Sequence, residues 1–373
     1  MILIIAFACI LILMGLQRIV YTKYWDDKLN VKISYKYVDC MADEENELVE
    51  VITNEKWLPL PMMHVKFDMP KSFVFENEKN SSISDNYYRD DVFSINGNQK
   101  IIRTLKFKCT SRGCFYMNDI NLTSSDLFLK TILSTRRKNP AVIHVFPKKI
   151  ALDFFEVPFN TITGNFSTNK TMIEDPFEFR GIRPYQQFDS MKHINWKSSA
   201  KNGELKVNTF FMTSSQDVKV LLNMDTHVYA YNERLIEKIV SIASSICEKV
   251  IEAGIPVGLI SNGKDIYTHE RIVRESGSGV KHMRVLDTAL ARIDAKAENY
   301  NFADVLKDEM ISNTDGLSSR TYYIIISNNR SKELIENYRE TKKLGILSYF
   351  IIPEYTQYEI TEQIPDMIKW DID

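Results

Sequence analysis

The stretch Val218-Lys-Val-Leu-Leu-Asn-Met224 decides the fold of the C-terminal half of this 373-residue chain. It is a nearly continuous apolar run, as expected of a strand that is buried on both faces of a sheet. A helical pattern from about Asn232 to Ala253 follows, and its paired apolar residues fall on one stripe. Gly254 can end this helix, and Pro256 begins the next apolar run. A strand, an amphipathic helix and a second strand predict an α/β arrangement.

The same alternation continues toward the C-terminus. The sequence predicts further strands at 321–327 and 346–353, and further helices at 280–297, 302–311 and 331–344. We therefore assign residues 216–373 to an α/β domain with a doubly wound, mostly parallel sheet. Ligands of such sheets bind at the carboxyl ends of the strands, which here lie near Asp225 and Ser327.

Upstream, residues 29–150 read as short strands. The clearest of them alternate with period two or stand between turn signals, and they lie at 31–37, 48–54, 63–67 and 100–109. Several short strands without an intervening helical pattern predict an antiparallel, immunoglobulin-like β-sandwich. The polar stretch from Asn77 to Asp91 is predicted to be a loop.

Residues 1–22 are predicted to form a transmembrane anchor. Met1 to Leu16 contains no charged residue, and the apolar character resumes after Arg18, so the span reaches the length needed to cross a bilayer. Arg18 would extend to the interface, where Tyr21, Tyr24 and Trp25 would form an aromatic belt. A cleaved signal peptide is the alternative, but the basic n-region and the small-residue cleavage site that it needs are absent.

Charge predicts the orientation of the anchor. Five basic residues follow the span and none precedes it: Arg18, Lys23, Lys28, Lys32 and Lys36. The positive-inside rule then places a single-pass protein in the cell membrane with its body in the cytoplasm. The whole chain has a formal net charge of −2, which argues against a nucleic-acid-binding protein.

The segment from Glu174 to Phe211 holds the most unusual cluster of polar and aromatic residues. Asp189 or Ser190 is a good N-cap for a helix that Gly203 can end. His193, Lys197 and Lys201 are spaced at four-residue intervals and would form one basic stripe on that helix. Arg180 and Arg183 lie just upstream.

This segment resembles the signature of the DUF58 family. The matching elements are Arg183-Pro-Tyr185, Asp189, Ile194-Asn-Trp196-Lys197, Ala200-Lys201 and Gly203-Glu-Leu205-Lys-Val207. Two residues depart from the family pattern, because Phe188 stands where glycine is usual and Lys201 stands where arginine is usual. We refer to residues 151–215, which contain this match, as the signature segment.

The resemblance implies a fold and a partner. DUF58 proteins look like membrane-anchored companions of MoxR-type AAA+ ATPases, and their C-terminal half is similar to a von Willebrand factor A domain. Members usually carry two apolar N-terminal helices, whereas one is predicted here. The resemblance therefore implies a protein partner, a MoxR-type ATPase, beside the lipid bilayer that the anchor requires.

A-domains often hold a divalent cation, and the resemblance directs attention to Asp225. In the family of A-domains this position opens an Asp-x-Ser-x-Ser motif, but here His227 and Tyr229 replace the hydroxyl residues. Near Ser327, Asn328 stands where a carboxylate is expected. Asp225 is then a lone hard ligand in a degenerate Mg²⁺ site, and we expect no cofactor.

Two interpretations of the signature residues remain open. Arg183, Asp189 and Lys197 could form a buried charge network, with Trp196 as a core anchor, or the same residues could bind a partner protein. We favour a non-enzymatic interaction module over two alternatives. One is a metal-dependent ligand receptor that uses Asp225 with the body outside the cell, and the other is a hydrolase that uses Asp189 and the basic stripe.

Overall fold

The computed structural model describes residues 2–75, 81–83, 87–168, 173–186, 189–213, 217–225, 233–311, 321–355 and 364–372. The chain divides into two compact units. The first unit comprises Met1–Ile150, Asp265–His269 and Arg284–Asp294. The second comprises Ala151–Lys264, Glu270–Met283 and Ala295–Asp373.

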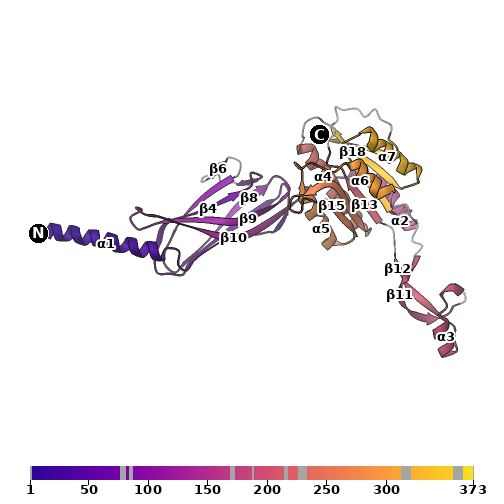
Figure 1. Cartoon of the computed structure of the whole chain (residues 1–373), viewed down its shortest axis with the longest axis horizontal. Coiled ribbons are helices and arrows are strands. Elements are labelled where there is room, and N and C mark those ends of the chain that lie inside the picture. The colour runs from indigo at the N-terminus through magenta and orange to yellow at the C-terminus, as the bar shows by residue number, and fades with distance from the viewer. Residues whose placement is uncertain are drawn as a thin grey trace. The chain divides into compact units, whose positions relative to one another are not determined.

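The first unit begins with one long apolar helix, α1 (Ile2–Tyr24), drawn in indigo in Figure 1. Its segment Ile4–Tyr24 is long and apolar enough to cross a membrane, and its side chains are almost all exposed. Tyr21 and Trp25 instead pack into the core of the β-sandwich, where Tyr21 Oη donates to the Pro59 carbonyl at 2.8 Å. The predicted aromatic belt is therefore wrong for these two residues, and only Tyr24, which is 43% exposed, keeps that position.

Two sheets form the β-sandwich, and their strands are antiparallel except where the short β2 runs parallel to β10, so the predicted sandwich fold of this part is confirmed. The four-stranded sheet has the order β1-β3-β8-β5, and the six-stranded sheet has the order β2-β10-β9-β4-β7-β6. The strands are β1 (Leu29–Tyr35), β2 (Asp39–Met41), β3 (Glu45–Asn54), β4 (Leu60–Met69), β5 (Phe73–Phe75), β6 (Ser81–Ile83), β7 (Tyr87–Ile95), β8 (Gln99–Cys109), β9 (Gly113–Ser125) and β10 (Ile132–Phe146).

One sequence prediction in this region needs correction. The predicted loop from Asn77 to Asp91 contains the start of β7, whose residues pair with β4. The polar character of the segment misled the prediction, because Arg89 and Asp91 are buried inside the sandwich despite their charges.

The second unit contains the signature segment and an α/β domain, which confirms the predicted α/β class. Its elements, and those of the short segments assigned to the first unit, are η1 (Asp153–Phe155), α2 (Glu156–Thr168), β11 (Ile173–Pro184), η2 (Met191–His193), α3 (Trp196–Asn202), β12 (Lys206–Thr213), β13 (Asp217–Leu222), α4 (Glu233–Glu252), β14 (Val257–Asp265), β15 (Arg271–Gly277), α5 (Val280–Ala291), β16 (Ile293–Asp294), α6 (Phe302–Leu306), the π-helical turn η3 (Lys307–Ile311), β17 (Thr321–Ile326), α7 (Lys332–Lys343), β18 (Ser348–Tyr355) and β19 (Met367–Ile372).

The α/β sheet has the order β15-β14-β13-β17-β18-β19, with β15 antiparallel to the other strands. Leu221, Tyr323 and Phe350 share a core cluster with α6 and α7, so these helices cover one face. Strand residues of the opposite parity are also buried, and α4, which contacts β13 and β18, covers them. The strand order switches at β13, because β14 and β15 lie on one side of it and β17, β18 and β19 lie on the other. Polar groups gather at the carboxyl end of β13, which is such a switch point.

Candidate functional site

Within the signature segment, β11 and β12 form an antiparallel two-stranded ribbon (Figure 1). The connection between the strands is tied at its base by a bidentate ion pair. Arg183 donates from Nη1 and Nη2 to the two carboxylate oxygens of Asp189, at 2.6 and 2.5 Å. The Gln186 amide also donates to Asp189, at 2.7 Å. The Arg183 guanidinium lowers the pKa of Asp189, so this carboxylate stays ionised and holds the connection between the strands in place.

Helix α3 begins later than the sequence predicted. The predicted helix from Asp189 or Ser190 to Gly203 is divided, because Ile194 forms a β-bridge with Val207 and leaves the helical path. Asn195 is the N-cap of α3 and accepts from the Ser198 amide at 2.9 Å. Gly203 ends the helix with a φ of 71°, in the left-handed region that glycine adopts most easily.

The division of the helix separates the predicted basic stripe. Lys197 and Lys201 remain on α3 and are exposed, whereas His193 lies in the separate turn η2 and is half-buried. Trp196 is 64% exposed, so its predicted role as a core anchor is wrong. Lys197 also lies outside the Arg183–Asp189 pair, and the predicted buried network of these three charges is wrong as well.

The remaining signature residues have backbone roles in the ribbon. The Tyr185 amide donates to the Leu205 carbonyl at 2.9 Å and extends the pairing of the two strands. Arg180 lies in β11, but its side chain is outside the described part of the structure, as is Phe188. Exposed apolar side chains accompany Trp196 on the ribbon: Ile182, Met191 and Leu205. The ribbon therefore presents an apolar and cationic surface, defined here by Ile182, Met191, Trp196, Lys197, Lys201 and Leu205.

A second polar site lies at the carboxyl ends of β13, β14 and β17. Asn223 follows β13, and its Nδ2 donates to Ser327 Oγ at 2.9 Å, so the two strand ends predicted to meet do so. Asn262 Nδ2 donates to Asn223 Oδ1 and to Asp225 Oδ2, both at 3.1 Å. Asn299 Nδ2 donates to Asp225 Oδ1 at 2.9 Å. Both oxygens of Asp225 thus receive amide N–H groups from the same chain.

This donor set does not fit a Mg²⁺ ion. Magnesium needs oxygen ligands, but two groups that face Asp225 present N–H donors, and the other hydrogen bonds of Asn262 fix its amide orientation. Burial raises the pKa of Asp225, although the hydrogen bonds from Asn299 and Asn262 oppose it. His227 and Tyr229 lie outside the described residues. Within the described part, no group of three or more His, Cys, Asp or Glu side chains could hold a metal.

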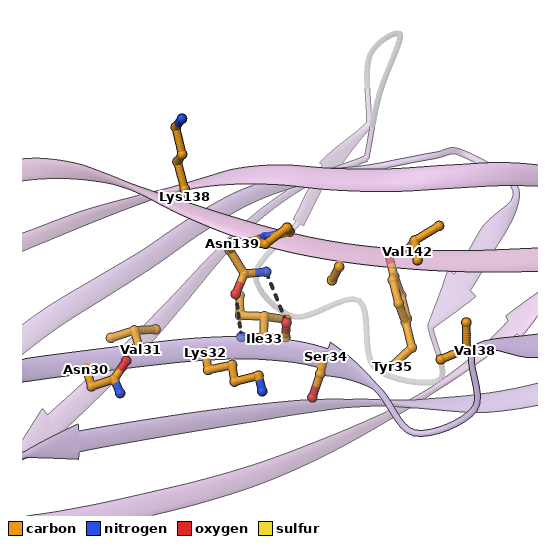
Figure 2. A pocket seen from close by; sticks show the side chains of 12 residues that line it. Asn30, Val31, Lys32, Ile33, Ser34, Tyr35, Val38, Lys138, Asn139 and Val142 are labelled. Atoms are coloured by element: carbon orange, nitrogen blue, oxygen red, sulfur yellow. Dashed lines mark hydrogen bonds between the residues drawn. The ribbon is translucent and has the colours of Figure 1, made fainter. Parts of the chain in front are cut away.

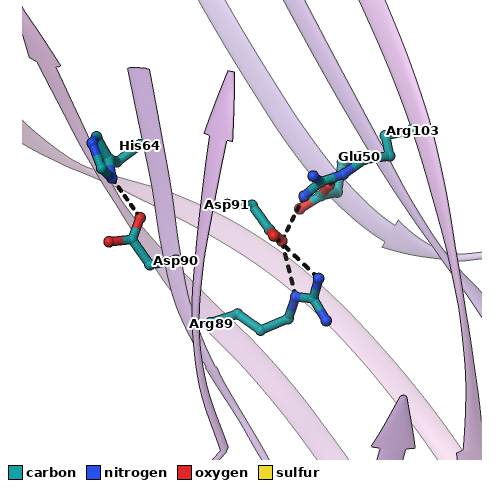
Figure 3. A network of polar contacts seen from close by, with 6 residues as sticks. All are labelled: Glu50, His64, Arg89, Asp90, Asp91 and Arg103. Atoms are coloured by element: carbon teal, nitrogen blue, oxygen red, sulfur yellow. Dashed lines mark hydrogen bonds and ion pairs between the residues drawn. The ribbon is translucent and has the colours of Figure 1, made fainter. Parts of the chain in front are cut away.

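A network of charged side chains connects the two sheets of the β-sandwich (Figure 3). Arg103 on β8 donates from Nε to Glu50 on the neighbouring β3 at 2.6 Å, and its Nη2 lies 2.6 Å from Asp91 on the other sheet. Arg89 binds the same Asp91 carboxylate through Nε and Nη2, at 2.9 and 3.1 Å. The guanidinium groups also lie over aromatic rings, Arg103 over Phe93 and Arg89 over Phe75.

Glu50 and Asp91 respond in opposite ways to this environment. Burial raises the pKa of Glu50 to about 7, and the nearby Asp91 adds to the shift while Arg103 opposes it. For Asp91 burial is outweighed by hydrogen bonds and charge from Arg89 and Arg103, and its pKa is lowered. Glu50 is therefore the member of the network that takes up a proton near neutral pH.

A groove of about 510 Å³ lies between β1 and β10 (Figure 2). Both strands are sheet edges there, because β1 ends one sheet and β2 pairs with β10 only at His144–Phe146. Asn139, at an irregularity in β10, accepts from the Ile33 amide at 2.9 Å and donates to the Ile33 carbonyl at 3.0 Å. One buried side-chain amide thus satisfies an edge peptide group that would otherwise be open for pairing.

Sequence reasoning did not find these sandwich residues. Period-two alternation in β3 was visible, and it places Glu50 on the same buried face as Leu48 and Ile52. That alternation was the available signal for a buried carboxylate. No comparable signal marked Asn139, whose role depends on a strand far away in the sequence.

Comparisons with known proteins give limited similarity. No protein-family model matches the chain. The uncharacterized protein YeaD of Bacillus subtilis (strain 168) is 28% identical over 114 residues, which are 31% of this chain and 26% of that protein. The chain therefore aligns with about a quarter of the length of this relative.

Among solved structures, the similarity is to β-domains. The CARDB domain of the PF1109 protein from Pyrococcus furiosus is 14% identical, with a TM-score of 0.21, over 32% of this chain and 93% of that one. Domains D2 and D3 of the major pilin SpaD from Corynebacterium diphtheriae are 9% identical, with a TM-score of 0.24, over 33% and 57%. A cohesin from Archaeoglobus fulgidus is 11% identical, with a TM-score of 0.20, over 31% and 91%. TM-scores of this size support no inference about this chain.

The pKa of Glu50 predicts a pH-dependent stability of the sandwich. The folded state holds the Glu50 proton up to about pH 7, whereas the unfolded chain releases it near the ordinary value of 4.5. The stabilisation is complete below that value and is lost as the pH rises through 7, by about 3 kcal/mol at roughly 1.4 kcal/mol per unit. Hydrogen exchange of β3 and β8 peptides in the full chain, corrected for intrinsic rates, should show this loss. Glu50→Gln should flatten it, and Glu47→Gln on the same strand should not; a full slope in Glu50→Gln would refute the assignment.

The Asp225 site predicts no stabilisation by magnesium. A site saturated at a hundredfold excess over its Kd would add about 2.7 kcal/mol to the free energy of unfolding. Because amide donors occupy both carboxylate oxygens, we expect the unfolding temperature of the full chain to be the same in millimolar MgCl₂ and in EDTA. A rise with MgCl₂ that Asp225→Ala abolishes would contradict this expectation.

Removal of the Asn139 side chain should open the β1 edge. Asn139→Ala leaves the Ile33 peptide without its two partners, at a cost of about 1–3 kcal/mol. The expected result is faster hydrogen exchange at the Ile33 amide than in the parent chain. Asn30→Ala, which removes an exposed amide from the same strand, is the matched control. Equal exchange at Ile33 in both variants would show that Asn139 does not protect this edge.

Proposed function

We propose that this chain is a membrane-anchored, non-enzymatic interaction module of the DUF58 type, which docks a MoxR-type AAA+ ATPase through its signature ribbon. The assembly would act in the maturation or assembly of a further protein at the membrane. The observation that carries the proposal is the exposure of Trp196 on a helix that also exposes Lys197 and Lys201. A large exposed aromatic side chain beside cations is typical of a protein-binding hot spot.

The architecture of the ribbon supports this role. The Arg183–Asp189 pair and the Asn195 cap fix the backbone on the N-terminal side of α3, so Trp196 is held by a preorganised support. Lys197 and Lys201 lie one helical turn apart, and no acidic residue lies within α3. A complementary partner surface would combine acidic side chains with an apolar pocket.

The family assignment rests on the sequence signature. The residues that resemble the DUF58 pattern are those that form the ribbon, and the α/β domain has the strand-helix alternation of a von Willebrand factor A domain. The anchor rests on α1 and its apolar, exposed surface. Basic residues in the C-terminal part of α1, among them Arg18 and Lys23, favour a cytoplasmic body, where a AAA+ ATPase would be available.

Asp189 offers little support for hydrolysis. A general acid or base works best with a pKa near the operating pH. Arg183 instead lowers the pKa of Asp189, which moves it further from neutral pH. Its two oxygens are already occupied by Arg183 and the Gln186 amide. A positioning role within the ribbon accounts for this geometry, and the hydrolase interpretation is therefore not preferred.

Copurification in mild detergent tests the proposed partner. The full chain at native expression should recover a MoxR-type ATPase, and Trp196→Ala should weaken binding about 30-fold, as expected for a hot spot of roughly 2 kcal/mol. Trp57→Ala is the matched control, because Trp57 is a comparably exposed tryptophan on the other unit, at 71%. Failure of the parent chain to recover an ATPase, or equal losses in both variants, would count against the proposal.

A further inference from the structure

The turn between β9 and β10 exposes an unusual run of apolar side chains. Leu127, Phe128 and Leu129 are 52%, 59% and 58% exposed, and Ile132 at the start of β10 is 80% exposed. Water-exposed turns are ordinarily built from small and polar residues. Four large apolar side chains within six residues instead indicate a surface that contacts something apolar.

The backbone of this turn is fixed by Asp126. The Asp126 carboxylate accepts from the Lys130 amide at 2.8 Å, and its carbonyl accepts from the Leu129 amide at 3.0 Å. Leu129 has a φ of 56°, a left-handed conformation that costs free energy for a leucine. Asp126 itself is buried, so the turn holds its apolar side chains outward instead of folding them into the sandwich.

The turn lies against the apolar helix α1, within the same unit. A small cavity of about 160 Å³ is lined on one side by Leu11, Gly15 and Arg18 of α1. The turn lines the other side through Phe128 and Lys130. The tip of this long hairpin therefore lies beside the second half of α1, rather than beside the residues that enter the sandwich core.

The position of the turn along α1 indicates how deep the turn would lie in a bilayer. Arg18 is the first charged residue of the helix, and Tyr21 is already inside the sandwich core, so the hydrocarbon must end near Arg18. The axial distance from Leu11 to Arg18 is about 10 Å at roughly 1.5 Å per residue. That distance matches the depth of about 5–10 Å to which interfacial apolar side chains enter a bilayer.

A second loop lies at the same end of the sandwich. Tyr21 Oη donates to the Pro59 carbonyl, which places the loop before β4 next to the last turns of α1. Trp57 in this loop is 71% exposed. Tryptophan is enriched at the level of lipid headgroups, about where this loop meets the helix.

From these observations we propose that the turn Leu127–Leu129 inserts into the bilayer beside α1, as a second membrane contact of the body. Lys130 and Arg18 then lie at the level of the headgroups, where anionic lipids favour cations. The inference rests on the proposed anchor, and it goes further, because it states which end of the β-sandwich lies on the lipid.

Depth-dependent fluorescence quenching tests the inserted turn. The full chain with Cys9→Ala offers only buried native cysteines, so Phe128→Cys in this background can be labelled with a polarity-sensitive fluorophore. Val74→Cys is the matched control, because Val74 is an exposed apolar residue on β5. β5 pairs with the C-terminal end of β8, whereas the N-terminal end of β8 lies toward α1. Both proteins are reconstituted into phosphatidylcholine–phosphatidylglycerol vesicles that carry a nitroxide high on the acyl chain.

We expect severalfold stronger quenching at position 128 than at position 74, and weaker quenching at 128 when Leu127→Ser and Leu129→Ser are added. Equal quenching at the two positions, in protein that floats with the vesicles after an alkaline carbonate wash, overturns the inserted turn and leaves the anchor intact. Loss of the protein from the vesicles in that wash overturns the anchor and the inserted turn together.

Discussion

The packing of Tyr21 and Trp25 into the β-sandwich is the contact on which the arrangement of the first unit depends. The helix that carries the apolar span continues without a break until its last residues become part of the sandwich core. Burial of two large aromatic side chains stabilises this junction by several kcal/mol, at roughly 1.5–3 kcal/mol for each large side chain. A flexible linker would let the sandwich move freely relative to the apolar helix, whereas this junction fixes one end of the sandwich to the helix.

Inside the sandwich, a network of buried charged side chains fixes the pairing of the strands. Glu50 and Arg103 are directly opposite each other in the β3–β8 pairing, and Arg103 reaches across to Asp91 on the other sheet. A slip of one residue in β3 would turn Glu50 to solvent and leave Arg103 without one of its partners. Removal of one partner from a buried pair costs about 3–5 kcal/mol, so the network selects one register even where it adds little net stability.

The sequence predicted elements where apolar periodicity was strong and failed where a distant contact decided the structure. The strand Asp217–Leu222 and the helix Glu233–Glu252 follow directly from their patterns, as does the apolar helix at the N-terminus. β15 and β19 were missed because they are short and partly polar edge strands. Charges hid the start of β7, since Arg89 and Asp91 are buried as an ion pair and Asp91 also pairs with Arg103.

The same limit applied to the candidate sites. The strand ends near Asp225 and Ser327 followed from the fold, but the amides of Asn262 and Asn299 that occupy the Asp225 oxygens come from later in the chain. Likewise, the β-bridge between Ile194 and Val207 divides the predicted helix, and local N-cap preferences could not reveal it. The sequence left Trp196 open as a core anchor or a partner-binding residue, since tryptophan is usually well buried, and its exposure is a property of the folded ribbon.

The distribution of polar and apolar groups argues for binding by surfaces. Three prominent carboxylates are each engaged by donors of the same chain: Asp189 by Arg183, Asp225 by two asparagine amides, and Glu50 by Arg103. A carboxylate in such surroundings has few lone pairs left for a substrate. Large apolar side chains, by contrast, are left in water at Trp196 and at Leu127–Leu129, on backbones that hydrogen bonds hold in place. Apolar side chains held exposed gain free energy when a partner or a bilayer covers them, and that gain is the physical basis of both proposed contacts.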